Sequence, residues 1–131
     1  MSAATSAVAR LQRSNRGSHF RAYGLRGDEA GALIDPFLGV DHAWISAPTF
    51  PPHPHAGFSA LSYLFLDSET GIDNRDSLGN RNLILPGGLH WTAAGRGVVH
   101  EEVRPRPEGP CTCCKSSSIS HASGKAPRRS H

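Results

Sequence analysis

Two short pairs of residues in this sequence have the types and the spacing to bind a metal ion. His53 and His55 are separated by one residue, and so are His100 and Glu102. In an extended strand, residues two apart point to the same face at about 7 Å from each other, so each pair can direct two ligands to one point. If the two segments face each other across a barrel, three imidazoles and one carboxylate converge. Such a donor set suits a divalent transition metal.

Strand parity also selects among the neighbouring candidates. Glu101 competes with Glu102, but only residue 102 shares the face of His100, so we expect Glu102 to be the ligand. His90 follows a Gly-Gly turn. It is expected either to line the same cavity or to be a partly exposed residue without a role at the site.

The elements that position these residues are short strands separated by turns. The chain contains 14 glycines and 10 prolines, which is typical of a turn-rich β protein. The segment from Phe58 to Leu66 is apolar on both of its faces, as expected for a strand that is packed on both sides. Further strands are predicted at residues 18–25, 72–76, 82–85, 89–92 and 98–103. The pattern predicts an all-β sandwich or barrel.

The net charge of +3 comes from the end of the chain. Residues 115–131 contain four basic residues and no acidic residue. The other 114 residues therefore hold 10 basic residues (14 − 4) against 11 acidic ones, a sum of −1. Because this body has no basic stripe interleaved with aromatic residues, we expect no direct binding to nucleic acid. No apolar run is long enough to span a bilayer, and we expect no role in a membrane.

The two ends differ in composition from the body at residues 17–110. Residues 1–16 contain three arginines and no acid, a composition that fits either a disordered tail or an organelle-targeting segment. Residues 111–131 are rich in serine, cysteine and basic residues and are expected to be disordered. All three cysteines lie within residues 111–114, so the body has none. This favours a reducing compartment, either the cytoplasm or the nucleus.

Several blocks of the sequence resemble the pirin family, in the family's order and spacing across about residues 18–104. The blocks are Asp35 to Leu38, Phe50 to Phe58, Arg75 to Asn80, Pro86-Gly87 and Trp91 to Glu102. The resemblance implies a cupin fold, which is a double-stranded β-helix or jelly-roll barrel. It also implies that this chain holds the first, iron-binding barrel of a two-barrel protein, with that barrel incomplete and followed by a disordered tail.

The resemblance also implies a cofactor and two kinds of function. The iron ligands of pirins match His53, His55, His100 and Glu102, so the implied cofactor is Fe²⁺ or another divalent transition metal. Some pirins are quercetin 2,3-dioxygenases, which open a flavonol ring with dioxygen and release carbon monoxide, so one expected partner is a flavonol-like small molecule. A nuclear pirin is an iron- and redox-dependent transcription co-regulator, which implies a protein partner. A third alternative is an inactive truncated product, because an incomplete barrel exposes strand edges.

This sequence departs from the pirin pattern close to the candidate ligands. Pirins usually carry Arg and Glu where Ala56 and Ser59 stand, and Asp and Gln near Gly88 and His90. The substitutions at Ala56 and Ser59 remove two charges beside the first histidine pair. They therefore change the groups that tune the metal and select the substrate.

The end of the chain is compatible with a shifted reading frame. Codons that encode Cys111 to His121 can be chosen so that another frame reads His-Val-Leu-Gln-Ile-Phe-Val-Asn-Leu-Pro, which is similar to the strand expected next in a pirin. We hypothesise that the residues from about 111 onward are out of frame, through gene-model error, pseudogenisation or altered splicing. Sequencing the transcript tests this hypothesis, and an unbroken frame with these codons in independent clones would contradict it.

Overall fold

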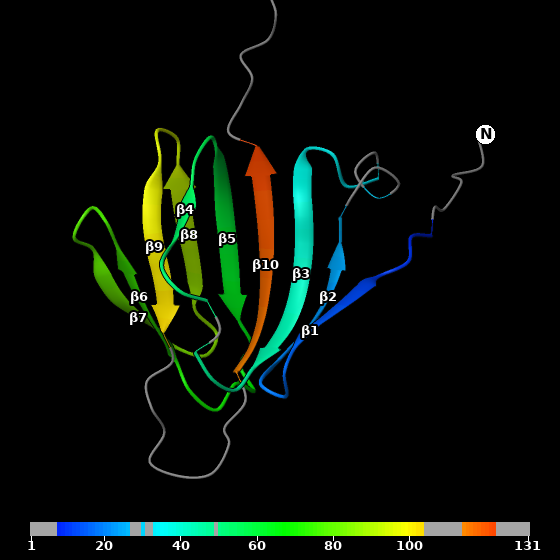
Figure 1. Cartoon of the computed structure of the whole chain (residues 1–131), viewed down its shortest axis with the longest axis horizontal. Coiled ribbons are helices and arrows are strands. Elements are labelled where there is room, and N and C mark those ends of the chain that lie inside the picture. Colours follow the sequence, from blue (N-terminus) through cyan, green and yellow to red (C-terminus); the bar gives the residue numbers. More distant parts are fainter. Residues whose placement is uncertain (1–7, 27–29, 31–32, 49, 104–113, 123–131) are drawn as a thin grey trace, which may run out of the picture.

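The computed structural model describes residues 8–26, 30, 33–48, 50–103 and 114–122, and these residues form an all-β structure (Figure 1). The strands are β1 (Gln12–Arg16), β2 (Phe20–Leu25), β3 (Phe37–Ile45), β4 (His53–His55), β5 (Phe58–Leu64), β6 (Ile72–Asp76), β7 (Arg81–Ile84), β8 (Leu89–Ala94), β9 (Val98–Val103) and β10 (Cys114–Ala122). The strands predicted in the second half of the body are confirmed to within two residues. In the described part of the chain, no helix has the length and apolar character needed to cross a membrane.

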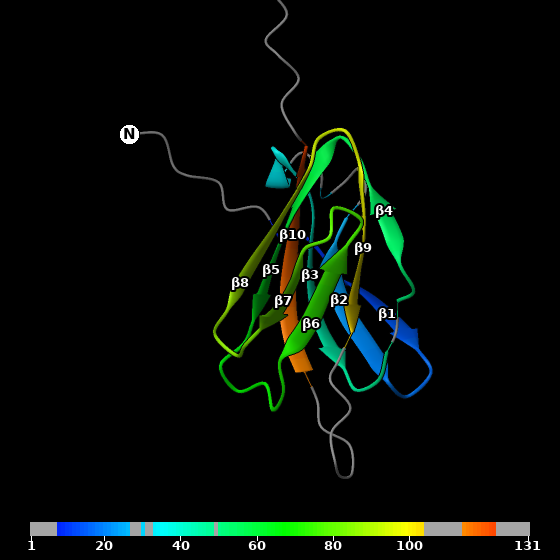
Figure 2. The same cartoon turned by 90° about the vertical axis from the view of Figure 1, so that its left-hand side faces the viewer.

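The strands form two antiparallel sheets. One has the order β1-β2-β3-β10-β5-β8, and the other has the order β4-β9-β6-β7. In Figures 1 and 2, the smaller sheet lies beside the β5–β8 end of the larger one, and β1 and β2 lie at the opposite end. The candidate ligands of β4 and β9 therefore belong to the smaller sheet, and the larger sheet contributes β8 close to them.

Strand β5 lies inside the larger sheet, and its residues before Leu64 are half-buried. It pairs with β10 on one side and with β8 on the other, and Leu64 at its end is 1% exposed. The strand ends there because the backbone of Leu64 bonds to a turn: its N–H donates to Gly88 O at 3.0 Å, and its carbonyl accepts from Gly87 N at 2.8 Å. Gly87 has a φ of +82°, a conformation that L side chains rarely adopt.

A small apolar cluster joins the two sheets next to the site. It consists of Leu64 from β5, Ile72 from β6 and Ile84 from β7, each of which is buried. Burying such side chains stabilises a fold by about 1.5–3 kcal/mol each. Because Ile72 and Asn74 share the inward face of β6, this cluster also determines where Asn74 lies.

Both end segments contain strands: residues 1–16, for which a disordered tail or a targeting segment was predicted, and residues 111–131, for which disorder was predicted. Within residues 1–16, Gln12–Arg16 form β1, and within residues 111–131, Cys114–Ala122 form β10 between β3 and β5. Disorder is therefore wrong for Gln12–Arg16 and Cys114–Ala122, the targeting alternative for residues 1–16 stays a prediction, and residues 1–7, 111–113 and 123–131 lie outside the described part. The physical reason is that ladder hydrogen bonds join main-chain groups, so the composition of a segment says little about whether a neighbouring edge pairs with it.

Candidate metal site

Pairing between β4 and β9 brings three histidines to one point. The register places His53 opposite His100 and His55 opposite Val98. The ring centroids lie 4.6 Å apart for His53 and His100, 4.6 Å apart for His55 and His100, and 4.9 Å apart for His53 and His55. One ligand nitrogen from each ring lies within 4.8 Å of the others. The alternation predicted from the sequence thus directs all three imidazoles to the same side of this strand pair.

The turn after β4 secures this strand against its neighbours. Gly57 has a φ of +75°, and its N–H donates to Ala94 O at 2.8 Å and to Gly95 O at 3.1 Å. The chain can therefore leave β4 in one sheet and enter β5 in the other within two residues. A residue with a Cβ would be strained at this φ, which explains the glycine directly after the histidine pair.

The backbone orients the first histidine. His53 Nδ1 lies 3.0 Å from the carbonyl oxygen of Pro51. A carbonyl only accepts, so Nδ1 carries the proton and donates it. Nε2 then keeps its lone pair, and it is the nitrogen of His53 that can bind a metal. A backbone carbonyl commonly holds a metal-binding histidine in this way.

Two asparagines orient His100, which is 5% exposed. Asn74 Nδ2 donates to Asn82 Oδ1 at 3.2 Å, so Asn74 Oδ1 faces His100 and accepts from its Nδ1–H at 3.2 Å. The lone pair of His100 therefore lies on Nε2, toward the other histidines. The sequence analysis missed Asn74, which is 1% exposed. The sequence could have indicated it, because Asn74 is two residues after Ile72 in a predicted strand and therefore shares the inward face of Ile72.

His55 is the residue whose hydrogen bonding is least complete. Its Nε2 lies 2.9 Å from Nε2 of His100, whose lone pair is there, so a proton on His55 Nε2 must join the two. Its Nδ1 is then a buried lone pair, and it has no partner among the described residues. A metal ion would replace the shared proton and accept both Nε2 lone pairs. His55 Nδ1 would then carry a proton. The site thus has the donor atoms that a metal needs.

The electrostatics of the site favour neutral imidazoles. Burial lowers the pKa of His100 to about 4, and the positive charges of His55, His53 and His90 act in the same direction. Burial, with a smaller effect of His53, also lowers the pKa of His55. At neutral pH these rings therefore do not need to lose a proton to solvent before they bind a cation.

Glu102 lies next to the three histidines but in a second cluster. One of its carboxylate oxygens lies within 4.8 Å of ligand nitrogens of His90 and His100. Burial raises the pKa of this carboxyl group, and the nearby His53 opposes the shift. Glu101 faces the other way, where its Oε1 lies 4.0 Å from Nη1 of Arg75. His100 therefore connects the histidine cluster to the carboxylate.

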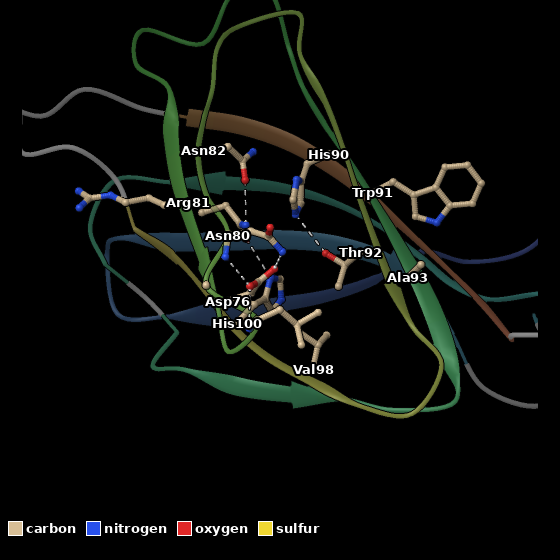
Figure 3. Close-up of a pocket in the computed structure, with 13 residues that line it drawn as sticks. Asp76, Asn80, Arg81, Asn82, His90, Trp91, Thr92, Ala93, Val98 and His100 are labelled. Atoms are coloured by element: carbon tan, nitrogen blue, oxygen red, sulfur yellow. Dashed lines mark hydrogen bonds between the residues drawn. The ribbon is translucent and has the colours of Figure 1, made fainter.

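A cavity opens beside this second cluster (Figure 3). It has a volume of about 600 Å³, and both His90 and His100 line it. His90 Nε2 lies 3.1 Å from Thr92 Oγ1. The other polar groups of the wall come from the β6–β7 hairpin and include Asn74, Asn80 and Asn82.

The β6–β7 hairpin is held by a carboxylate. Asp76 Oδ1 accepts from the N–H groups of Leu78 at 2.9 Å and Asn80 at 3.0 Å, and its Oδ2 accepts from Asn80 Nδ2 at 2.8 Å. The side-chain bond from Asn80 is the main reason that the pKa of Asp76 is lowered. Asp76 also pairs with His100 in the register of β6 and β9, so this turn supports the wall of the cavity.

Comparison with known proteins places these features in one family. The Pirin family model matches residues 19–115, so the chain belongs to the pirin family. Pirin-like protein 2 of Arabidopsis thaliana is 38% identical over 96 residues, which are 72% of this chain and 28% of that protein.

Two solved structures extend the comparison to the fold. A protein from Geobacillus kaustophilus superposes with a TM-score of 0.71 at 24% identity, over 87% of this chain and 43% of that one. A quercetin 2,3-dioxygenase from Acinetobacter baumannii superposes with a TM-score of 0.64 at 26% identity, over 87% of this chain and 45% of that one. The predicted cupin-type β fold is confirmed. The chain spans less than half the length of each of these three proteins.

Proposed function

We propose that this chain is a metal-binding pirin domain whose divalent transition metal is held by His53, His55, His100 and Glu102. The observation that carries the proposal is the contact between Nε2 of His55 and Nε2 of His100, which lie 2.9 Å apart while Nδ1 of His55 is buried without a partner among the described residues. A metal bound by both Nε2 lone pairs would let Nδ1 of His55 carry a proton in place of a buried lone pair.

We further propose that the reaction is flavonol ring cleavage of the quercetin 2,3-dioxygenase type, with Fe²⁺ as the metal. Bound iron would supply a Lewis acid for the flavonol oxygens and a place for dioxygen. Residues of this chain would orient the flavonol. The cavity beside His100 is lined by Asn74, Asn80 and Asn82, whose amides can bond to ligand hydroxyls. The solved relative that acts on quercetin supports this choice of reaction.

A non-enzymatic function has a separate observation in its favour. Leu89 and Trp91 on β8 are 62% and 66% exposed, and they share its outward face. Exposed neighbouring apolar side chains are typical of protein contact surfaces. The second candidate is therefore an iron-dependent binding protein that docks a protein partner and does not turn over a substrate.

The first experiment is the metal content of the purified chain, measured by elemental mass spectrometry. We expect about one divalent metal per chain, and we expect it to be lost in His53→Ala and kept in the control His19→Ala. Release of carbon monoxide from quercetin by the metal-loaded chain would then support the dioxygenase. Metal without carbon monoxide would favour the binding protein, and the absence of metal would contradict both.

A further inference from the structure

We propose that His90 is a ligand of the metal, in addition to the four residues named above. This inference rests on the proposed metal site and adds one residue to it. The resemblance to the family implies four ligands, and His90 is not one of them.

The placement of His90 is the first support. His90 lies on β8 in the larger sheet, whereas His100 and Glu102 lie on β9 in the smaller one. One ligand atom from each of these three residues lies within 4.8 Å of the others. Donors at metal–ligand bond lengths of about 2.0–2.2 Å are separated by up to about 4.4 Å, so small side-chain shifts are enough. His90 thus brings a donor from the opposite wall of the barrel.

Strand parity keeps His90 on this inner side. Along β8 the side chains alternate, and those of Leu89, Trp91 and Ala93 are exposed while those of His90 and Thr92 are half-buried. The β5–β8 ladder determines this alternation, with Ser62 opposite His90. A one-residue slip of the ladder would bury Trp91 and expose His90, so the position of the imidazole is tied to the packing of the whole strand.

The hydrogen bonding of the His90 ring is the second support. The hydroxyl of Thr92 lies 3.1 Å from Nε2. When Nε2–H donates to that hydroxyl, Nδ1 carries the lone pair. This is the arrangement in which a neighbouring oxygen orients a metal-binding imidazole.

A fifth protein ligand changes what the metal can do. An octahedral ion with four protein ligands has two open positions, one for a substrate and one for dioxygen. With His90 bound, only one position is open. We therefore expect this chain to hold metal more tightly than its His90→Gln variant and to be the poorer dioxygenase of the two.

The experiment uses Co²⁺ as the probe on the full chain, its His90→Gln variant and the control His19→Gln. We expect each to bind one Co²⁺. The affinity of His90→Gln should be about tenfold or more lower, and its visible absorption should change because the coordination number changes. The control should match the natural chain in both. Identical affinity and absorption in His90→Gln and the natural chain would overturn the inference and leave the four-ligand site intact.

A second measurement uses the natural chain and needs no variant. In the Co²⁺-loaded natural chain, the ring N–H protons of bound histidines are shifted far from their usual NMR positions by the paramagnetic ion. We expect such signals from four histidines, His53, His55, His90 and His100. Signals from three would overturn the role of His90 alone, and failure of the natural chain to bind Co²⁺ would overturn the proposed metal site together with it.

Discussion

Strands β9 and β10 are both paired on two sides, yet they are held in different ways. Strand β9 lies between β4 and β6; its His100 belongs to both metal-ligand clusters, and its Glu102 belongs to the second. Strand β10 lies between β3 and β5, and its sequence has Ile119 as the one large aliphatic residue. Strand β9 is therefore tied to its neighbours by side-chain contacts as well as by main-chain pairing, whereas for β10 the structure describes main-chain pairing alone. The predictions below test this difference.

The largest expected effect is the loss of His100, which links the two clusters. His100→Ala should reduce metal affinity at least about 100-fold, because a central ligand is removed. Glu101→Ala should change it less than about threefold, because Glu101 points to Arg75 on the other face. Titration of both variants with Co²⁺ measures the contrast. Equal losses would show that the register of β9 is wrong.

The second largest effect is expected at Asn74, which orients His100 through a hydrogen bond. Asn74→Ala removes the acceptor of His100 Nδ1–H and the donor to Asn82. We expect a loss of about 1–3 kcal/mol in the free energy of unfolding, because the buried Nδ1–H of His100 loses its acceptor. Metal affinity should fall about 10–100-fold. Urea unfolding and metal titration measure the two effects. Asn15→Ala on the exposed β1 serves as the control, and a similar result in both variants would refute the orienting role of Asn74.

A backbone substitution is the sharpest test of β10. Ser118→Pro removes an N–H from a strand that pairs on both sides and should cost about 1–3 kcal/mol in the free energy of unfolding. Ser118→Ala keeps the backbone and should cost less than about 0.5 kcal/mol. Urea unfolding of the two variants tests this contrast. If Ser118→Pro is as stable as the natural chain, β10 does not contribute to the barrel.

The smallest effect is the pH dependence of the metal-free chain. The unfolded chain binds protons on His100 below pH 6.5, whereas the folded chain does so only near pH 4. Protons therefore favour unfolding in this interval, and stability should fall as the pH is lowered, by about 1 kcal/mol between pH 7 and pH 5.5. The lowered pKa of His55 acts in the same direction, and the raised pKa of the Glu102 carboxyl group opposes both. Urea unfolding in a chelator at several pH values tests the sign, and constant or rising stability on acidification would contradict it.

Much of the site follows from the sequence because a strand repeats every two residues. That period places His53 with His55 and His100 with Glu102, and it turns Glu101 away, without any knowledge of the neighbouring strands. The strongest strands, such as Phe58–Leu64, are also predictable, because their burial leaves an apolar pattern in their residues.

The tertiary structure decided what depends on pairing between distant segments. The register of β4 against β9 brings His55 to His100, and the β6–β9 ladder brings Asn74 beneath the latter. These contacts span 45 and 26 residues, and no local period encodes them. Strands β1 and β10 are not encoded by a local period either, because their main-chain hydrogen bonds do not depend on side-chain type. His90 likewise reaches Glu102 only because two sheets close around one cavity.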